Sequence, residues 1–531
     1  MSPMTTKVLL INPPWVSKDE NIWNGIKAAM PPLSLLSIGA YLEQHGLHVS
    51  ILDIHIEKLS AEQVKERIKA ADPDWVGLTV MTATSIPAHK VARLVKEACP
   101  RAKVVFGGVH AEALPLESLS NSAVDYVVRG DGEDTFLRMV KGEDPTKLNG
   151  VSWRKGNEVE NNPPVEVNMD LDRMPRPAYH MVPMHMYYPT IGSYQKLPAI
   201  NMLMTRGCPG KCTFCNSANT TLRSRSADKV VAEIEHLRDT YGIQEIQFYD
   251  DTFTVNRKNV LRFCELMVER KVGVSWVAFI RADCFNDELG EAMKKAGCHQ
   301  VLIGIESGDD EILKNIRKPI HRERIQQSID IARKYGIESR CAFIFGNQGE
   351  TMETMQRTLD YSMKLDPDLA LYNISTPYPG TQLFQWAKDN GYLVSDEWSD
   401  FELSTFLLRL PTVSEEQVFS FYAYAHKKFY MRPKALWRRI KKFRHWSHIR
   451  DALHAFFYIV LRHKLGRRGE VRAVWVGFKK TDFFDLDMSE AGVAPKLTYE
   501  LRQPKTVDAG AWGSQAHREA QSAASGKRTA G

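Results

Sequence analysis

Short apolar runs alternate with helix-like segments along most of this chain, and this alternation most limits the folds open to it. In the first third, the runs "KVLLIN", "HVSILD", "WVGLTV" and "KVVFGG" are separated by segments with helical character, for example at 60–70 and 86–98. Strands separated by helices of about 10–15 residues indicate parallel βαβ units. We therefore predict an α/β protein in which ligands bind at the carboxyl ends of the strands.

The loops that follow these strands carry the first candidate binding residues. They read "NPPW", "TVMTATS", "GGVH" and "RGDGED", and the paired Gly107 and Gly108 let a backbone approach a bulky ligand closely. Neither GxGxxG nor GxxxxGK[ST] follows the first strand, so the sequence does not indicate a dinucleotide or a P-loop nucleotide. A structural domain with ordinary glycine turns is the alternative at this point.

A second alternating series runs from about 196 to 410. The runs "PAINMLMTRG", "IQEIQFYDD", "VSWVAFIRAD", "HQVLIGIESG" and "ESRCAFIFGNQGE" come in order, and most are followed by a helix-like segment. Polar residues stand where these strands end, which is where barrel-like folds place their chemistry. This pattern favours a parallel barrel as the second domain.

Three of the eight cysteines stand in the stretch "MTRGCPGKCTFCNS". The CxxxCxxC spacing of Cys208, Cys212 and Cys215 lets one loop reach one metal centre, and thiolates suit zinc or iron–sulfur clusters. A closed zinc site would need a fourth ligand from a distant residue. Three thiolates on a 4Fe–4S cluster leave one iron open to substrate. The spacing favours the cluster over zinc, and either over unliganded thiols.

The other cysteines are scattered, and we interpret them as small packed residues. They are Cys99, Cys264, Cys284, Cys298 and Cys341. Eight cysteines in 531 residues do not form a disulfide scaffold, so a reduced cytosolic setting fits best.

These features together resemble the radical S-adenosylmethionine (SAM) superfamily over most of the chain. The resemblance implies a partial (β/α)6 barrel and a 4Fe–4S cluster on Cys208, Cys212 and Cys215, whose unique iron chelates the amino and carboxylate groups of SAM. It further implies SAM-binding roles for the residues at these motifs, which are Phe214, Asp250, Asp251, Arg281, Glu306 and Ser307. Taken singly, the aspartates could cap a helix, Arg281 could form an ion pair and Glu306 could hold a loop.

The first segment resembles the Rossmann-like cobalamin-binding domain of one large subgroup, on the stretches "INPPW", "PPLSLLSIGAYLEQHG", "GGVH" and "RGDGED". The cobalamin-binding residues that this implies are Thr79, Thr82, Gly107, Gly108, His110, Gly130, Gly132 and Glu133. The usual DxHxxG motif is absent after the first strand. We interpret Asp53-Ile54-His55, after the second strand, as local capping, and we therefore expect cobalamin to bind without a histidine ligand.

The basic stretch 431–468 holds twelve Lys or Arg residues and one acidic residue, interleaved with aromatic residues. Such a segment suits an anionic membrane surface, and a helical cap on the barrel is the alternative. Nucleic acid is not expected, because no binding motif accompanies the charge. No run of about 20 apolar residues is present, so we expect no membrane-spanning helix.

The expected organisation has five parts. These are a cobalamin-binding domain at 1–145, a linker at 146–195, a radical SAM barrel at 196–410, a helical basic region at 411–500 and a disordered tail at 501–531.

The resemblance implies an enzyme that cleaves SAM to a 5′-deoxyadenosyl radical and methylates an unactivated carbon with the help of cobalamin. The basic stretch suggests a hydrophobic isoprenoid lipid substrate, as for the hopanoid C-3 methylases. An electron donor such as flavodoxin or ferredoxin would be a partner. We expect a cytoplasmic protein that is peripheral on the inner face of the membrane.

Three other functions stay open. The anaerobic magnesium-protoporphyrin monomethyl ester cyclases share the same layout but make no methylated product. Methylthiotransferases usually carry further cluster cysteines near the N-terminus, whereas residues 1–150 contain only Cys99. A zinc-stapled binding protein without catalytic activity is the third.

Overall fold

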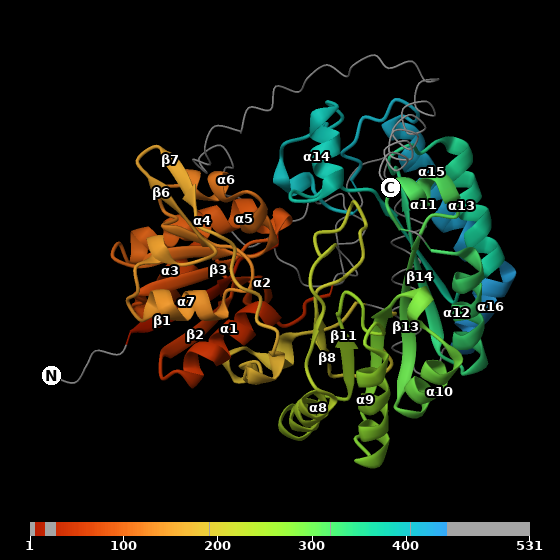
Figure 1. Ribbon diagram of the computed structural model, residues 1–531, viewed down its shortest axis with the longest axis horizontal. Helices are drawn as coiled ribbons and strands as arrows, with labels where there is room; N and C mark the ends of the chain where they lie inside the picture. The colour runs from red at the N-terminus through yellow and green to blue at the C-terminus, as the bar shows by residue number, and fades with distance from the viewer. Residues whose placement is uncertain (1–5, 16–27, 191, 319, 404, 443–531) are drawn as a thin grey trace, which may run out of the picture.

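The computed structural model describes residues 6–15, 28–190, 192–318, 320–403 and 405–442. Two sheets lie side by side in it (Figure 1). The first sheet belongs to the N-terminal third, drawn in red to orange, and the second to the middle of the chain, drawn in yellow-green to cyan. The later part of the predicted basic region and the predicted disordered tail lie outside the described residues.

The first sheet has the strand order β2-β1-β3-β4-β5-β6-β7, and it is parallel from β2 to β5. Its strands are β1 (Lys7–Asn12), β2 (His48–Asp53), β3 (Trp75–Thr79), β4 (Lys103–Gly107), β5 (Tyr126–Val128), β6 (Val151–Lys155) and β7 (Glu158–Asn161). Its helices are α1 (Leu33–Gln44), α2 (Ile54–Glu57), α3 (Ala61–Ala71), α4 (Ser85–Ala98), α5 (Val109–Ala113), α6 (Pro115–Ser120) and α7 (Glu133–Val140). The parallel order confirms the α/β fold expected from the alternation.

The predicted linker at 146–195 begins with part of this sheet. β6 pairs antiparallel with β5, and β7 pairs antiparallel with β6. This hairpin forms the edge of the sheet and alternates polar with apolar residues, so it lacks the apolar run that marks a strand buried on both faces. Three short 3₁₀ turns follow it, at Leu171–Arg173, Tyr179–Met181 and Met184–Met186.

The second sheet is parallel throughout, and each strand pairs with the next one along the chain in the order β15-β14-β13-β12-β11-β8. Its strands are β8 (Ala199–Met202), β11 (Glu245–Phe248), β12 (Ser275–Ile280), β13 (Cys298–Glu306), β14 (Glu338–Phe345) and β15 (Leu369–Ile374). Six parallel strands with intervening helices form the partial barrel that the sequence predicts. A separate hairpin of β9 (Thr205–Arg206) and β10 (Arg223–Ser224) follows β8.

Local signals set where the barrel helices begin and end. The Ser226 hydroxyl accepts a hydrogen bond from the Lys229 N–H at the start of α8, and Gly242, with φ of +67°, ends that helix. The helices are α8 (Ala227–Tyr241), α9 (Arg257–Glu269), α10 (Asp287–Lys295), α11 (Asp310–Asn315), α12 (Arg322–Lys334), α13 (Met352–Leu365), α14 (Gln382–Asp389), α15 (Glu415–Tyr430) and α16 (Pro433–Lys442).

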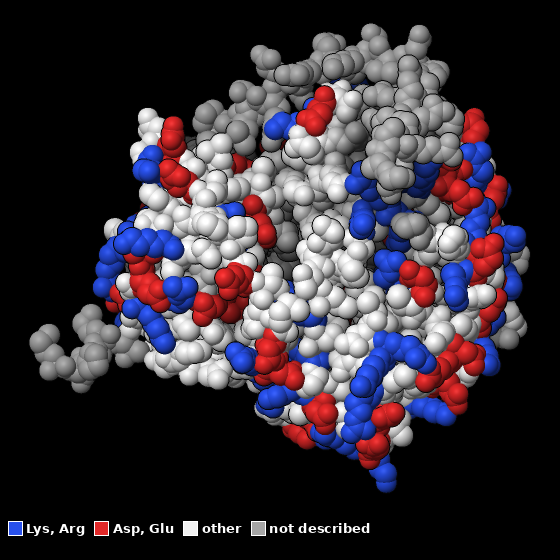
Figure 2. All heavy atoms as spheres, viewed as in Figure 1, with Lys and Arg blue, Asp and Glu red and all other residues white. Residues whose placement is uncertain are grey.

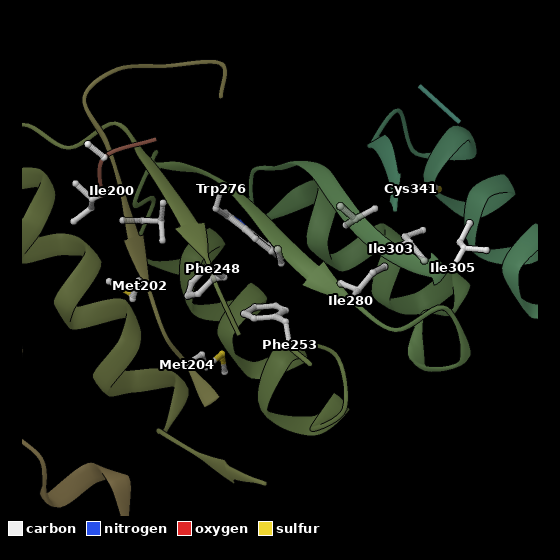
Figure 3. Packing of buried hydrophobic residues seen from close by; sticks show 14 of the residues in the cluster. Ile200, Met202, Met204, Phe248, Phe253, Trp276, Ile280, Ile303, Ile305 and Cys341 are labelled. Carbon is white, nitrogen blue, oxygen red and sulfur yellow. The ribbon is translucent and has the colours of Figure 1, made fainter. Parts of the chain in front are cut away.

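An aromatic cluster packs on one face of the second sheet (Figure 3). The ring of Trp276 on β12 lies 5.7 Å from that of Phe248 on β11 and 5.3 Å from that of Phe263 on α9. Side chains along a strand point alternately to the two faces of its sheet. The neighbours of these rings along the strands, Gln247 and Val277, therefore point into the barrel.

The C-terminal helices are attached to the barrel. The Tyr430 hydroxyl on α15 donates a hydrogen bond to the Ala370 carbonyl of β15, 2.7 Å away. Beyond it, Arg432, Lys434 and Arg438 all pair with Asp366 at the end of α13. The first part of the basic stretch therefore packs on the barrel.

Charged residues of both signs are interspersed over the face shown in Figure 2, and neither sign covers a whole domain there. No helix among the described residues is long and apolar enough to span a bilayer.

Candidate functional site

The three clustered cysteines lie on one loop between β9 and β10. The ends of this loop are joined, because the Cys208 N–H donates to the Thr220 hydroxyl and the Thr220 N–H donates to the Cys208 carbonyl, both at 2.9 Å. Gly207 enters the loop with φ of +88°, which favours glycine. The middle of the loop is fixed to the barrel by the Thr213 N–H, which donates to the Ile316 carbonyl.

The three thiols are close enough to affect one another electrostatically. Burial raises the pKa of Cys215, and the thiols of Cys212 and Cys208 raise it further. Burial also raises the pKa of Cys212, while the cations of Lys318 and Arg281 oppose this rise. The loop thus presents three sulfur donors beside two positive charges, which stabilise thiolates. In the described part of the chain, no three His, Cys, Asp or Glu side chains converge on the position of a single metal ion.

The two aspartates that follow β11 face in different directions. Asp250 is fully buried, and its carboxylate accepts hydrogen bonds from the N–H groups of Met204 and Thr205 and from the Thr205 hydroxyl. These bonds fix the chain just before the cysteine loop. Burial raises the pKa of Asp250 to about 6. Asp251 is exposed and lies close enough to Cys215 to raise the pKa of that thiol.

Arg281 follows β12 and reaches the cysteine loop. A Cβ on Gly210 would lie 3.1 Å from the Cys208 Sγ and 3.2 Å from the Arg281 Nη1, so guanidinium and thiol meet at this glycine. Two hydrogen bonds to Asp283, of 3.0 and 2.7 Å, orient the guanidinium. Cys284 lies beside Arg281 and is half-buried, whereas the other four cysteines outside the loop are buried.

Glu306 ends β13 in a strained backbone conformation. Its φ is +70°, and the register between β13 and β14 shifts at Gly304 and Glu306. Non-glycine residues with such φ values cluster at functional sites. The Glu306 carboxylate accepts a hydrogen bond of 2.6 Å from Lys318, which is also near Cys212.

Ser307 has a different environment. Its buried hydroxyl bonds to the Thr358 hydroxyl on α13, 3.0 Å away, and accepts from the Asp309 N–H. Phe214 is half-buried against the core. Of the residues proposed to bind SAM, Asp251, Arg281 and Glu306 lie beside the thiols, whereas Asp250 and Ser307 hold the structure around them.

At the carboxyl end of the first sheet, the loops after β3 and β4 are locked together. The Val80 N–H donates to the Gly107 carbonyl at 2.7 Å, and the His110 N–H donates to the Val80 carbonyl at 3.1 Å. Gly108 has φ of +95°, and a Cβ there would lie 2.8 Å from the Val80 carbonyl oxygen. Near this junction the side chains of Met81 and Val109 are exposed, at 44% and 48%. They provide an apolar surface at the end of the sheet.

His110 points into the protein. Its ring nitrogens lie 3.3 Å from the Thr82 hydroxyl and 3.2 Å from the Glu117 carboxylate. Trp398, from the segment after α14, packs against the His110 ring and donates a hydrogen bond of 3.1 Å to Glu117. Among the predicted cobalamin-binding residues, Thr82 and His110 therefore belong to a buried contact between the two domains.

The "RGDGED" loop after β5 joins the first sheet to the cysteine hairpin. Glu133 accepts a hydrogen bond of 2.8 Å from Arg206 on β9, and Asp131 pairs with Arg223 on β10. Gly130, with φ of +81°, and Gly132 lie in this loop. Thr79 ends β3, and its hydroxyl lies 3.3 Å from where a Cβ on Gly108 would stand. The carboxyl ends of the first sheet therefore face the three cysteines.

The Asp53-Ile54-His55 stretch acts as a cap, as interpreted from the sequence. Asp53 caps α2 by accepting from the Ile56 N–H, and it also accepts from the Tyr187 hydroxyl at 2.8 Å. His55 Nδ1 accepts from the Trp15 N–H at 3.2 Å.

Comparison with known families matches both halves of the chain. Residues 24–140 match the B12 binding domain, and residues 202–362 match the radical SAM superfamily. An uncharacterized methyltransferase of Pyrococcus horikoshii is 34% identical over 81% of this chain and 94% of its own length. The anaerobic magnesium-protoporphyrin IX monomethyl ester cyclase of Rubrivivax gelatinosus is 30% identical over 71% of this chain and 69% of its own.

The fold is also that of a solved structure. The radical S-adenosylmethionine methyltransferase TsrM of Kitasatospora setae, with cobalamin and a [4Fe-4S] cluster bound, superimposes with a TM-score of 0.61 at 20% identity. The match covers 74% of this chain and 79% of that one. This protein therefore belongs to the radical SAM superfamily, in the branch that carries an N-terminal cobalamin-binding domain, and it is an enzyme.

The cofactors of this enzyme are a 4Fe–4S cluster, SAM and cobalamin. The residues present fit them. Three thiols on one loop beside two cations suit a cluster and an anionic cosubstrate. The exposed apolar side chains at the carboxyl ends of β3 and β4 suit the flat face of a corrin.

Several residues of the site carry no signal in the sequence. Lys318 lies in a loop twelve residues after Glu306, and Arg206 is an ordinary residue before the cysteines. Trp398 is almost 300 residues from its partner Glu117. Their roles come from contacts between distant segments, which no local spacing encodes.

Proposed function

We propose that this enzyme transfers a methyl group to a carbon atom of a small molecule. The observation that carries the proposal is the pairing of Arg206 with Glu133 and of Arg223 with Asp131. These ion pairs hold the cysteine loop opposite the strand ends of the cobalamin-type domain. When bound, the cofactors supply radical chemistry on one side of this interface and a transferable methyl group on the other.

Cys208, Cys212 and Cys215 would hold the cluster. Asp251, Arg281 and Glu306 surround the same loop, so they are the residues we propose to orient SAM, with Phe214, half-buried against the core, just before the last cysteine. Arg281 offers a guanidinium for a carboxylate, and Lys318 holds the Glu306 carboxylate in position. Asp250 and Ser307 would position the loop and the end of β13 without direct contact.

Thr79 and Gly107 end β3 and β4, and Gly108, Gly130 and Gly132 lie in the loops after the strands. All five would border the corrin. Thr82, His110 and Glu133 would act behind them, through the contacts with Glu117 and Arg206. None of these arrangements supplies a free imidazole among the described residues. We therefore propose that cobalamin binds without a histidine ligand to cobalt. His55→Ala should leave the absorption spectrum of the bound cobalamin unchanged, and a spectral shift would contradict this assignment.

The cluster assignment is tested by substitution. Cys208→Ala, Cys212→Ala and Cys215→Ala should each abolish the brown absorbance of the anaerobically reconstituted protein and the cleavage of SAM to 5′-deoxyadenosine. Cys264→Ala and Cys298→Ala are the controls, because both thiols are buried away from the loop. Loss of the cluster in Cys298→Ala would show that the ligand set is wrong.

Ring formation of the cyclase type is the second candidate, because a cyclase covers two thirds of this chain at 30% identity. The longer match to a relative named as a methyltransferase, at 34%, supports methyl transfer. Mass spectrometry of the product separates the two candidates, since only a methyltransferase adds a carbon from SAM.

The sequence also predicts a hydrophobic isoprenoid lipid as the acceptor, of the hopanoid type, and a flavodoxin or ferredoxin as electron donor. The lipid prediction rests on the basic stretch 431–468. Of this stretch, residues 431–442 are described, and α16 within it pairs with Asp366. Both predictions stay proposals, as do a cytoplasmic location and contact with the inner face of the membrane.

A further inference from the structure

A cavity of about 100 Å³ lies inside the barrel, on the face of the second sheet opposite the aromatic cluster. Side chains of β11, β12, β13 and β14 form its walls, and the chain at Thr190 and Ser193 borders it. No part of the site described above uses this cavity.

The strand register places the cavity directly below the cysteine loop. Phe279 on β12 is level with Leu302 on β13, which is level with Arg340 on β14. Residues two apart along a strand point to the same side. Arg281, which lies beside the thiols, directly follows β12 and is two residues beyond the cavity residue Phe279. A molecule in the cavity would therefore lie one layer of side chains below the site proposed for SAM.

Most of the side chains that line the cavity are apolar or aromatic, or are amides that already donate hydrogen bonds to the backbone. The rings of Tyr249 and Phe279 stack with their centres 5.3 Å apart and their planes 13° apart. The Gln247 amide donates to the Ser193 carbonyl at 3.0 Å, and the Gln300 amide donates to the Gly192 carbonyl at 3.3 Å. The stacked rings form a flat apolar platform.

Arg340 is the one charged side chain among the described residues that line this cavity. Its Nε is buried and has no hydrogen-bond acceptor, and no described carboxylate forms an ion pair with it. Loss of hydration lowers the pKa of its guanidinium. By contrast, Arg206 and Arg281 each have carboxylate partners. An unpaired cation inside a protein costs stability, so it calls for a ligand of opposite charge.

We propose that this cavity binds the methyl acceptor through an anionic group, a carboxylate or a phosphate, whose charge Arg340 balances. The inference rests on the proposed methyl transfer and names the class of its substrate. A guanidinium can donate two parallel hydrogen bonds to either group. The Tyr249–Phe279 platform would carry the planar or apolar remainder of the molecule. The acceptor is then an acid, so an isoprenoid acceptor of the kind that the basic stretch suggests would have to carry an acidic group.

The first test measures binding of simple probes to the full-length protein with its cluster. Fluorine NMR line broadening is followed for 4-fluorobenzoate, 4-fluorophenyl phosphate and the neutral 4-fluorobenzamide. At least one anion should bind, and the benzamide should bind at least about tenfold more weakly, because it lacks the charge. The stronger of the two anions identifies the acidic group. Equal binding of the benzamide, or binding of none of the three, overturns the proposal.

Substitutions of Arg340 test whether the anion binds at this residue. Arg340→Gln should weaken binding of the preferred anion at least about tenfold, and Arg340→Lys should restore part of the lost affinity. The matched control is Arg173→Gln, which removes an arginine whose side chain is 81% exposed. Anion binding that is equal in Arg340→Gln and wild type overturns the proposal.

The thermal stability of an Arg340 variant distinguishes a role of this residue in binding from a role in supporting the fold. Without ligand, Arg340→Met should raise the thermal unfolding midpoint, by about 2 °C or more, because it removes a half-buried charge that has no ion-pair partner among the described residues. A lowered midpoint would show that Arg340 supports the fold, and would count against the proposal. Wild-type protein that cleaves SAM but binds neither anion leaves the proposed function intact. Protein that forms no cluster contradicts the proposed function, whatever the probes do.

Discussion

Gly108 shows how one residue shapes the strand-end surface of the first domain. Its φ of +95° is almost the same as the +93° of Gly142, but their surroundings differ. A Cβ on Gly108 would lie 2.8 and 2.9 Å from the Val80 backbone, whereas a Cβ on Gly142 would meet nothing within 4 Å. Gly108 also has ψ of 167°, a combination with positive φ that essentially only glycine adopts, so both its backbone conformation and its contact with Val80 disfavour a side chain.

We predict that Gly142→Ala lowers the free energy of unfolding by about 1–2 kcal/mol, the cost of left-handed backbone in a residue with a Cβ. Gly108→Ala should cost clearly more, because the Val80 backbone must also move, and should weaken cobalamin binding. Thermal unfolding and cobalamin titration measure the two effects. Equal losses of stability in the two variants would show that the loops after β3 and β4 can shift to make room for a side chain at little cost in free energy.

Asp250 gives a pH dependence with a definite sign. Burial raises its pKa from 3.8 to about 6, so the folded protein holds this proton where the unfolded chain has released it. The contribution of this group to stability is therefore fully present below about pH 4 and is lost as pH rises to about 6 and above. A pKa difference of one between the folded and unfolded states corresponds to ~1.4 kcal/mol.

We predict that Asp250→Asn removes this part of the pH dependence and lowers stability at neutral pH. The amide oxygen can take the place of Oδ1, but the amide nitrogen then replaces Oδ2, which also accepts from the Met204 N–H, so two donors face each other there at a cost of about 1–3 kcal/mol. Thermal unfolding midpoints of the two proteins, followed from about pH 4.5 to about pH 7 across the raised pKa, supply the comparison. Parallel pH profiles would contradict the assignment.

At the scale of elements, the β9–β10 hairpin joins the cysteine loop to the first domain. The side chains of Arg206 and Glu133 are 24% and 9% exposed, so this ion pair is largely shielded from water. Removing one partner of a buried pair costs about 3–5 kcal/mol, because the other charge stays buried without compensation. An exposed pair such as Arg173–Asp170 contributes only about 0–1 kcal/mol.

We predict that Arg206→Gln and Glu133→Gln are each strongly destabilising, and that the double variant costs much less than the sum of the two. Arg173→Gln is the matched control and should change little. Urea unfolding of wild type, the two single variants and the double variant measures the coupling energy between Arg206 and Glu133. The affinity for cobalamin should fall together with the free energy of unfolding. Strictly additive losses would mean that the hairpin is held by other contacts.

At the scale of the whole molecule, α16 fixes where the basic stretch leaves the barrel. Arg432, Lys434 and Arg438 are paired with Asp366, so a chain that ends at Lys442 keeps these contacts. Residues 443–468 carry a further six Lys or Arg and one Asp. Each cation near an anionic surface contributes about 1 kcal/mol of attraction.

We predict that the intact chain sediments with vesicles that contain phosphatidylserine at low salt, and that the chain ending at Lys442 does not. High salt should release part of the intact chain, because it screens charge but not apolar contact. Neutral vesicles are the control. Equal sedimentation of the two chains would remove the main support for a membrane partner.

The alternation of apolar runs and helices predicted both sheets, because strands covered on both faces must be apolar along their length. The hairpin of β6 and β7 was not predicted. Its residues Arg154, Lys155 and Glu158 are those of a surface linker, and only its pairing with β5 makes it part of the sheet.

The local chemistry of this protein could be predicted from neighbouring residues along the chain. Three thiols within eight residues must share one loop, and Asp53 before a short helix caps it, because both depend on neighbours along the chain. The cofactors followed from the resemblance of several motifs to a known superfamily, because the spacing of the thiols alone left zinc open.

Which polar residues face the cysteine loop depends on contacts between segments that are distant in the chain. Asp250 turns into the protein while Asp251 turns outward, Lys318 meets Glu306, and Arg340 stands unpaired in the barrel. These outcomes depend on strand register and on how far each strand extends before its loop begins. Register brings together residues that are far apart in the chain, so no spacing within one segment can predict them.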